Sequence, residues 1–121
     1  MEIDFVSFSL AMKLKEKGFR EEVNAYYGKW ENLFDVHPAL DMNDCDYRAS
    51  APTISQVLKW LREAKRIDAG AVWDNRDGKW IGYINEMDMP DLVGEYILQN
   101  TYDTYEQAAI AGIEYVIDKL I

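Results

Sequence analysis

The chain has few of the residues on which metal, redox and disulfide chemistry depend. Its 121 residues include one cysteine and one histidine, Cys45 and His37. A single cysteine cannot form a disulfide within the chain, which fits a reducing compartment. A structural zinc site normally needs four nitrogen or sulfur ligands. The sequence therefore predicts no metal site, no cofactor and no internal disulfide.

Long apolar runs are also missing. No stretch approaches the roughly 20 apolar residues that are needed to cross a bilayer. The N-terminal residues MEIDFVSFSL include acids where a secretory signal carries basic residues. We therefore expect a cytoplasmic protein without a membrane partner. With 49% hydrophobic residues, the chain has enough apolar material for one core, and we expect a single domain over residues 1–121.

Basic residues are scarce in the C-terminal half, and the net charge is −9. Residues 1–66 carry 10 basic and 11 acidic side chains, whereas residues 67–121 carry 3 basic and 11 acidic ones, a net charge of −8. Such an acidic half repels phosphate backbones and anionic membrane surfaces. Nucleic acid is therefore a disfavoured partner, and an acidic mimic of nucleic acid is a further alternative.

The stretch 51–70 predicts a helix that leads into a strand. Thr53 and Gln56 have the spacing of a capping box, in which a hydroxyl and an amide bond the first backbone N–H groups. The apolar residues that follow fall along one helical stripe. They are Ile54, Val57, Leu58, Leu61 and Ala64. This helix is the centre of the predicted scaffold.

Three strands are predicted after this helix. Residues 71–75 and 79–86 form a hairpin, with Gly78 suited to the positive φ of the connection. Residues 88–94 read as a connection, and 95–99 predict a third, short strand.

The last element is predicted to be a second capped helix. Thr104 and Gln107 repeat the capping box, and small residues at 108, 109 and 112 allow close approach to a sheet. We therefore predict an α+β fold, an antiparallel sheet of three to four strands packed by helices mainly on one face. The predicted C-terminal order is helix, strand, strand, strand, helix.

The N-terminal part is less regular. Residues 7–18 predict a helix that Ser7 or Ser9 caps and Gly18 ends. The aromatic stretch 23–36 suggests a strand or a hairpin. Residues 37–50 read as an ordered loop, with Tyr47 as its expected anchor.

Two sequence segments resemble a known group. APTISQVLKWLRE and YDTYEQAAIAGIEYVIDKL resemble small uncharacterised proteins of gut Bacteroidetes and their prophages, which share an APT-x-x-Q…W-x-R-E helix and a YDTYE-x-A…GI helix. The likeness covers residues 50–120 and extends weakly to LKEKGF in the first helix. It implies an origin in mobile elements and no particular activity.

A second, weaker likeness concerns residues 89–120. This segment is similar to the end of HicB-type antitoxins, where a PDLPG segment precedes a T-x-E-E-A helix, although Val93 replaces the second proline of that pattern. It implies a nucleic-acid-linked regulator. The predicted order of elements also resembles that of double-stranded RNA-binding domains, but Asp103 and Glu106 stand where RNA contacts need basic residues.

Candidate catalytic groups are sparse. Cys45 and His37 form the sole possible thiol–imidazole pair and have no evident orienting partner. Asp41, Asp44 and Asp46 lie nearby, but the order Asp41-x-Asn43-x-Cys45 departs from a calcium loop at the third ligand and lacks the glycine. No glycine-rich phosphate loop or small-molecule substrate site is evident, and whether two of the 22 acids meet as a catalytic pair stays open.

We therefore predict a small protein without enzymatic activity, a protein-interaction or accessory module. Its partner is another protein or a second copy of the chain, because aromatic residues are abundant and catalytic groupings are lacking. A HicB-like antitoxin or other nucleic-acid-linked regulator is the alternative. The candidate interaction surface comprises Trp60, Lys59, Arg62 and Arg66.

Overall fold

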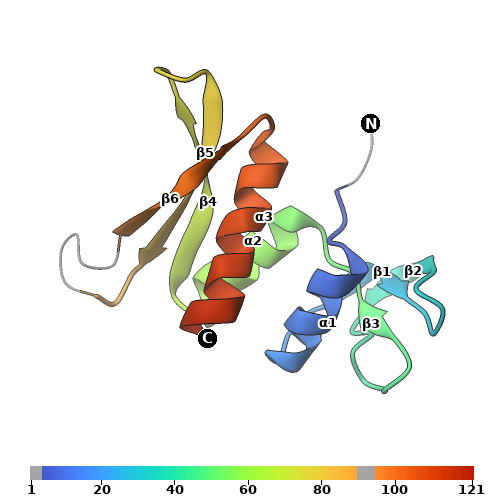
Figure 1. Cartoon of the computed structure of the whole chain (residues 1–121). Coiled ribbons are helices and arrows are strands. Elements are labelled where there is room, and N and C mark those ends of the chain that lie inside the picture. Colours follow the sequence, from blue (N-terminus) through green and yellow to red (C-terminus); the bar gives the residue numbers. More distant parts are fainter. Residues whose placement is uncertain (1–3, 90–94) are drawn as a thin grey trace. The chain divides into compact units, whose positions relative to one another are not determined.

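A computed structural model describes residues 4–89 and 95–121 of the chain (Figure 1). The chain divides into two compact units, Met1–Gln56 (unit 1) and Val57–Ile121 (unit 2), and each has a three-stranded antiparallel sheet. The predicted α+β class is confirmed. The sheets number two because the aromatic N-terminal strand pairs within unit 1 and does not extend the C-terminal sheet. The single domain over 1–121 stays a prediction.

Unit 1 packs a short helix against a small sheet. Helix α1 begins after Ser7, whose Oγ accepts a hydrogen bond from the Leu10 amide at 3.2 Å, and it stops before Gly18, which has φ +87°. The predicted first helix is thereby confirmed. The predicted hairpin is confirmed by the antiparallel pairing of residues 23–27 with residues 33–40. The sheet has the strand order β2-β1-β3. The elements are α1 (Phe8–Glu16), β1 (Val23–Tyr27), β2 (Leu33–Leu40) and β3 (Ala49–Ser50).

The prediction of a loop over 37–50 is wrong at both ends. Its first four residues continue β2 and its last two form β3. Tyr47 is not the anchor, because its side chain is 65% exposed. The anchor is the buried Asn43, whose amide donates to the Phe19 carbonyl at 2.8 Å and accepts from the Ser50 amide at 2.8 Å.

Helix α2 (Ile54–Ala64) has the predicted capping box. The backbone N–H of Gln56 donates to the Thr53 hydroxyl oxygen at 3.2 Å, and the backbone N–H of Thr53 donates to the side-chain Oε1 of Gln56 at 2.8 Å. The predicted apolar stripe is buried over most of its length, but its last member, Ala64, is exposed because the helix ends there. The buried members are Ile54, Val57, Leu58 and Leu61, and Trp60 beside the stripe is buried as well.

Unit 2 continues in the predicted order of three strands and a helix. Strand β4 starts at Ile67, earlier than predicted, because Ile67 already pairs in register with Glu86. Strand β6 runs on past Gln99 to Tyr102. The elements are β4 (Ile67–Asp74), β5 (Lys79–Glu86), β6 (Glu95–Tyr102), α3 (Tyr105–Tyr115) and the π-helical turn η1 (Val116–Leu120). Of the predicted connection 88–94, residues 90–94 lie outside the described part.

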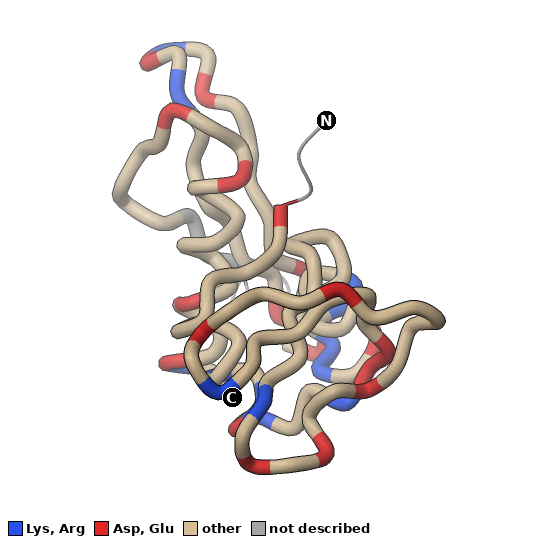
Figure 2. The backbone as a smooth tube through the Cα atoms, turned by 90° about the vertical axis from the view of Figure 1, so that its right-hand side faces the viewer, with Lys and Arg blue, Asp and Glu red and all other residues tan. Residues whose placement is uncertain are grey.

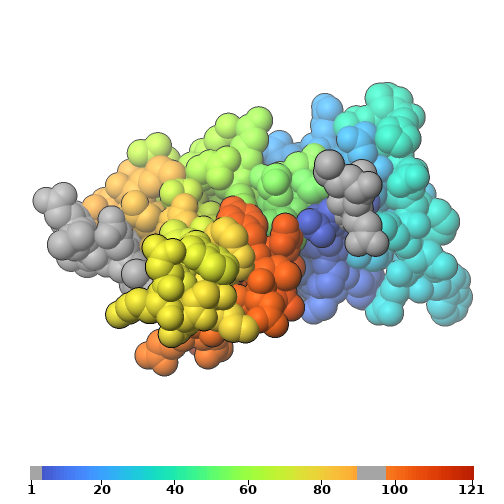
Figure 3. Space-filling model, turned by 90° about the horizontal axis from the view of Figure 1, so that it is seen from above, coloured from blue at the N-terminus to red at the C-terminus, as the bar shows by residue number. Residues whose placement is uncertain are grey.

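Helix α3 lies very close to the sheet of unit 2 and contacts chiefly β4 and β5. Figure 3 shows the orange-red surface of this region beside the yellow surface of the β4–β5 hairpin. A Cβ atom on Gly82 would lie 2.9 Å from the carbonyl oxygen of Ala108. A Cβ atom on Gly112 would lie 3.5 Å from the carbonyl oxygens of Gly70 and Tyr83. The small residues of the helix therefore allow it to approach the sheet closely, as predicted. Gly82 on β5 allows the same close approach from the side of the sheet.

Candidate functional site

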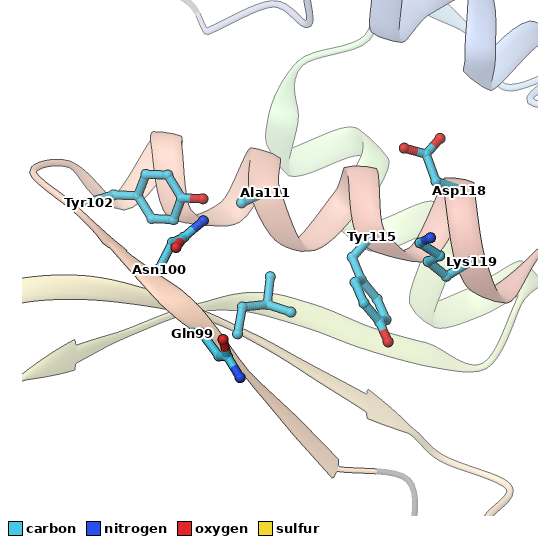
Figure 4. Close-up of a pocket in the computed structure, with 8 residues that line it drawn as sticks. Gln99, Asn100, Tyr102, Ala111, Tyr115, Asp118 and Lys119 are labelled. Carbon is cyan, nitrogen blue, oxygen red and sulfur yellow. The ribbon is translucent and has the colours of Figure 1, made fainter.

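A groove of about 550 Å³ lies between β6 and the last helix of unit 2 (Figure 4). It exists because α3 covers β4 and β5 more fully than β6 and so leaves part of the β6 face uncovered. The groove is open to solvent and not an enclosed cavity. Its lining residues are Leu98, Gln99, Asn100, Tyr102, Ala111, Tyr115, Asp118 and Lys119.

The strand wall of the groove contains a β-bulge. Ile81 pairs with Thr101 and Tyr83 pairs with Ile97, so the three residues 98–100 face the single residue Gly82. A bulge bends its strand and leaves backbone groups outside the regular ladder. Among the strands that the structure describes, β6 pairs with β5 alone, so its outer edge is open.

The helix wall consists of residues spaced by helical turns. Ala111, Tyr115 and Asp118 lie at i, i+4 and i+7, and therefore on one side of the helix. In Figure 4 the Tyr115 ring extends from α3 toward the strands. The helix ends in the π-helical turn η1, which contributes Asp118 and Lys119. Such turns occur frequently at functional sites.

An aromatic group adjoins one end of the groove. Tyr102 lines the groove and pairs in register with Trp80. The Trp80 ring packs edge-on against Trp73 and Tyr105, with ring centroids 5.2 and 5.4 Å apart. Trp73 is 50% exposed. Large aromatic side chains that are partly exposed are typical anchors of protein interfaces.

The unit that contains the groove is acidic, while the groove lining itself has one acid, Asp118, and one base, Lys119. Unit 2 has a net charge of −5, from 7 basic and 12 acidic side chains, whose positions along the backbone are marked in Figure 2. Lys79 donates a hydrogen bond to Asp103, and this bond holds the pKa of the Asp103 carboxyl below its usual value. On the other face of the sheet, burial and then the neighbouring Asp68 carboxylate raise the pKa of Tyr83.

The interaction surface that the sequence suggests lies away from the groove. Lys59 and Arg62 are exposed on α2, and Arg66 follows it and pairs with Asp88 at 3.3 Å. Trp60 is 5% exposed, so its ring offers little area to a partner. The indole also has the Lys65 ammonium 5.5 Å from its ring centroid.

The polar loop of unit 1 uses two of its acids in ion pairs. Arg20 pairs with Asp41 at 2.5 Å, and Arg48 pairs with Asp44 at 2.6 Å. The hydrogen bond from the guanidinium holds the pKa of the Asp44 carboxyl below its usual value. Across residues 4–89 and 95–121, no group of three or more His, Cys, Asp or Glu side chains has the arrangement of a metal site.

Unit 1 has a smaller pocket of about 220 Å³. The Arg48 Nε atom beside it is buried without a hydrogen-bond partner among the described groups, while the rest of the guanidinium pairs with Asp44. The pocket has less than half the volume of the groove, so it is less suited to an extended ligand. Its lining residues are Phe8, Met12, Gly28, Lys29, Asp46, Tyr47 and Arg48.

The sequence did not point to the groove residues. Tyr115 and Asp118 share a side of the predicted last helix, and Tyr102 stands just before its cap, so a polar stripe beside the capping box was the available signal. The sequence could not show how much of β6 the last helix covers.

Comparison with protein-family models, curated proteins and solved structures finds no match to this chain. Among the helices in the described part of the chain, none has the length and apolar character to span a membrane.

Proposed function

We propose that this protein is a non-enzymatic interaction module that binds an extended segment of another protein in the groove between β6 and α3. The observation that carries the proposal is the groove itself, which follows an open, bulged edge strand and has tyrosine and amide side chains on its walls. Extended peptides add to exposed sheet edges through main-chain hydrogen bonds, and alternate side chains provide specificity.

The form of the groove favours a peptide over a small molecule. Small-molecule sites bury most of the ligand surface in a concave pocket. This groove is open to solvent and not enclosed, which suits a segment that lies across it. The Asn100 and Gln99 amides can pair with a peptide backbone, since each offers a donor and an acceptor.

The test is selection of random peptides displayed on phage against the purified chain, followed by NMR titration of the ¹⁵N-labelled chain. Selected peptides are expected to shift the amide resonances of residues 98–102 and 111–119. Ala111→Leu fills the groove and is expected to weaken binding at least tenfold, roughly 1.4 kcal/mol. Ala64→Leu is the matched control, because Ala64 is exposed on α2, outside the groove.

Two results would overturn the proposal. One is a set of selected peptides whose shifts map outside the groove or whose affinity Ala111→Leu leaves unchanged. The other is the nucleic-acid alternative, in which a DNA or RNA duplex at low salt shifts the amides of Lys59, Arg62 and Arg66 and peptide selection yields no binder. Low salt is the sensitive condition, because phosphate contacts weaken steeply as salt rises.

A further inference from the structure

Four aromatic residues, which we call the aromatic row, lie at the hairpin end of β4 and β5. Trp73 pairs in register with Trp80, and Trp80 pairs in register with Tyr102, so these three side chains share one face of the sheet. Tyr105, the first residue of α3, packs edge-on against Trp80. The row is accessible to a partner, because Trp73 is 50% exposed and Tyr105 is 37% exposed.

We infer that the aromatic row binds a proline-rich segment in the polyproline II conformation, with prolines three residues apart. Segments of this kind dock on aromatic-lined surfaces in several types of binding domain. The inference goes beyond the proposed function, because it concerns a second surface of unit 2. Tyr102 is the residue that the row shares with the lining of the groove.

The spacing of the row matches the repeat of this conformation. Neighbouring strands lie roughly 4.8 Å apart, so the strands of Trp73 and Tyr102 are separated by roughly 9–10 Å. A polyproline II helix has three residues per turn and rises about 3.1 Å per residue, so its residues i and i+3 lie on one side about 9 Å apart. A segment that crosses the three strands therefore places one proline near Trp73 and the next near Tyr102.

A segment in the β conformation fits the row less well. Its side chains repeat on one side at roughly 7 Å, which is shorter than the separation between β4 and β6. It also needs an open strand edge for its main-chain hydrogen bonds, whereas the row lies on the face of the sheet. The face and the edge of this sheet therefore suit different segments.

The side chains of the row also suit the backbone of such a segment. Polyproline II has no internal hydrogen bonds, so its carbonyl groups need donors from outside. Tryptophan N–H and tyrosine O–H groups are such donors, and their rings offer apolar area to the proline rings. Because the conformation is largely formed before binding, little ordering entropy is lost.

The test uses two fluorescein-labelled decapeptides of identical composition, in which prolines are placed among alanines and glutamines. The prolines stand at i, i+3 and i+6 in the first peptide and at i, i+2 and i+4 in the second. Fluorescence anisotropy gives the dissociation constants, and the first peptide is expected to bind roughly tenfold more tightly. In NMR titration of the ¹⁵N-labelled chain, it is expected to shift the indole N–H resonances of Trp73 and Trp80 and to leave that of Trp30 in place.

Substitutions locate the binding. Trp73→Val keeps a residue that favours strands and is expected to weaken binding of the first peptide at least roughly tenfold. Tyr105→Leu, on α3 and outside the strand pairing, is expected to weaken it as well. Trp30→Val is the matched control with unchanged affinity, because Trp30 is 80% exposed in unit 1. Ala111→Leu, which fills the groove, is also expected to leave the affinity unchanged.

Three results would overturn the inference. The first is equal affinity for the two peptides, because the row would then recognise no spacing. The second is that the indole resonances of Trp73 and Trp80 do not shift, or that Trp73→Val binds as the native chain does; if Trp73→Val does not fold, Tyr105→Leu decides. The third is a dimer in light scattering whose Trp73 and Trp80 resonances shift with concentration, because a second copy would then occupy the row.

The two proposals can fail separately. If phage-selected peptides shift the groove resonances while neither proline peptide binds, the inference about the aromatic row fails and the proposed function stands. If the first proline peptide binds with the native affinity in Ala111→Leu while no selected peptide occupies the groove, the proposed function fails and the inference stands.

Discussion

The two units of the chain hold their backbones in place by different means. Unit 2 has three paired strands of eight residues each and a helix in close contact with the sheet through glycines. Unit 1 has shorter strand pairing, and side chains bond its loop to distant backbone groups, as Asn43 does at Phe19 and Ser50. Lys15 likewise donates to the carbonyls of Cys45 and Arg48. Regular ladders position a surface groove, whereas individual polar contacts position a loop.

The largest expected effect is in unit 1. Asn43→Ala removes two buried hydrogen bonds, one to the Phe19 carbonyl and one from the Ser50 amide, so we expect a loss of about 2–4 kcal/mol in the free energy of unfolding. Chemical denaturation followed by circular dichroism measures it. Asn24→Ala is the control, because Asn24 is exposed and its side-chain amide bonds the Val36 carbonyl at 3.1 Å and His37 Nδ1 at 3.5 Å, both at the surface. Equal losses in both variants would show that burial of Asn43 is not decisive.

The next effect tests the contact between helix and sheet in unit 2. Gly82→Ala places a methyl group 2.9 Å from the Ala108 carbonyl oxygen, which is backbone, and we expect a destabilisation of about 1–3 kcal/mol. In Gly112→Ala the nearest atoms lie at 3.5 Å, and alanine favours the helix, so stability is expected to stay equal or rise by up to about 1 kcal/mol. Thermal unfolding compares the two. If Gly82→Ala proves as stable as Gly112→Ala, the close approach does not determine the position of the helix.

The smallest expected difference between the two units is in how exposed ion pairs affect their carboxyl groups. The Lys79 hydrogen bond lowers the pKa of Asp103 in unit 2, as Arg48 does for Asp44 in unit 1. Because the lowered pKa favours the carboxylate in the folded state, the pair stabilises the fold above the ordinary aspartate pKa. This contribution is lost as the pH falls through the lowered value.

The pKa of Asp103 can be followed by NMR titration of its carboxyl carbon. Lys79→Met is expected to raise the midpoint toward the usual aspartate value, whereas Lys59→Met, on α2, leaves it unchanged. An unchanged midpoint in Lys79→Met would show that the pair does not persist in solution.

The sequence predicted the helices and strands that depend on residues close together in the chain. Capping boxes at Thr53 and Thr104, and apolar residues at helical spacing, depend on neighbours within a few positions, and both helices formed as expected. The loop over 37–50 was misjudged because its two ends pair with β1 and because Asn43 bonds the Phe19 carbonyl 24 residues away, and no local pattern reveals either contact.

The candidate site was harder to predict than the fold. Periodicity shows that Ala111 and Tyr115 share one side of a helix, but the groove depends on where that helix rests across the sheet. Contacts of Gly82 and Gly112 with backbone atoms determine this position. The basic surface on α2, by contrast, was readable from spacing, and Trp60 was misleading because its burial depends on packing.

The bulge at residues 98–100 has a consequence for selectivity. A flat, open edge strand invites pairing with any other strand, including those of misfolded chains, and natural sheets interrupt such edges with bulges. Three residues of β6 opposite Gly82 break the regular spacing that an ordinary strand needs for continuous pairing. The bulge that shapes the groove thus also contributes to selectivity. It disfavours pairing with an arbitrary strand, and a segment binds only if its contacts in the groove offset the irregular register.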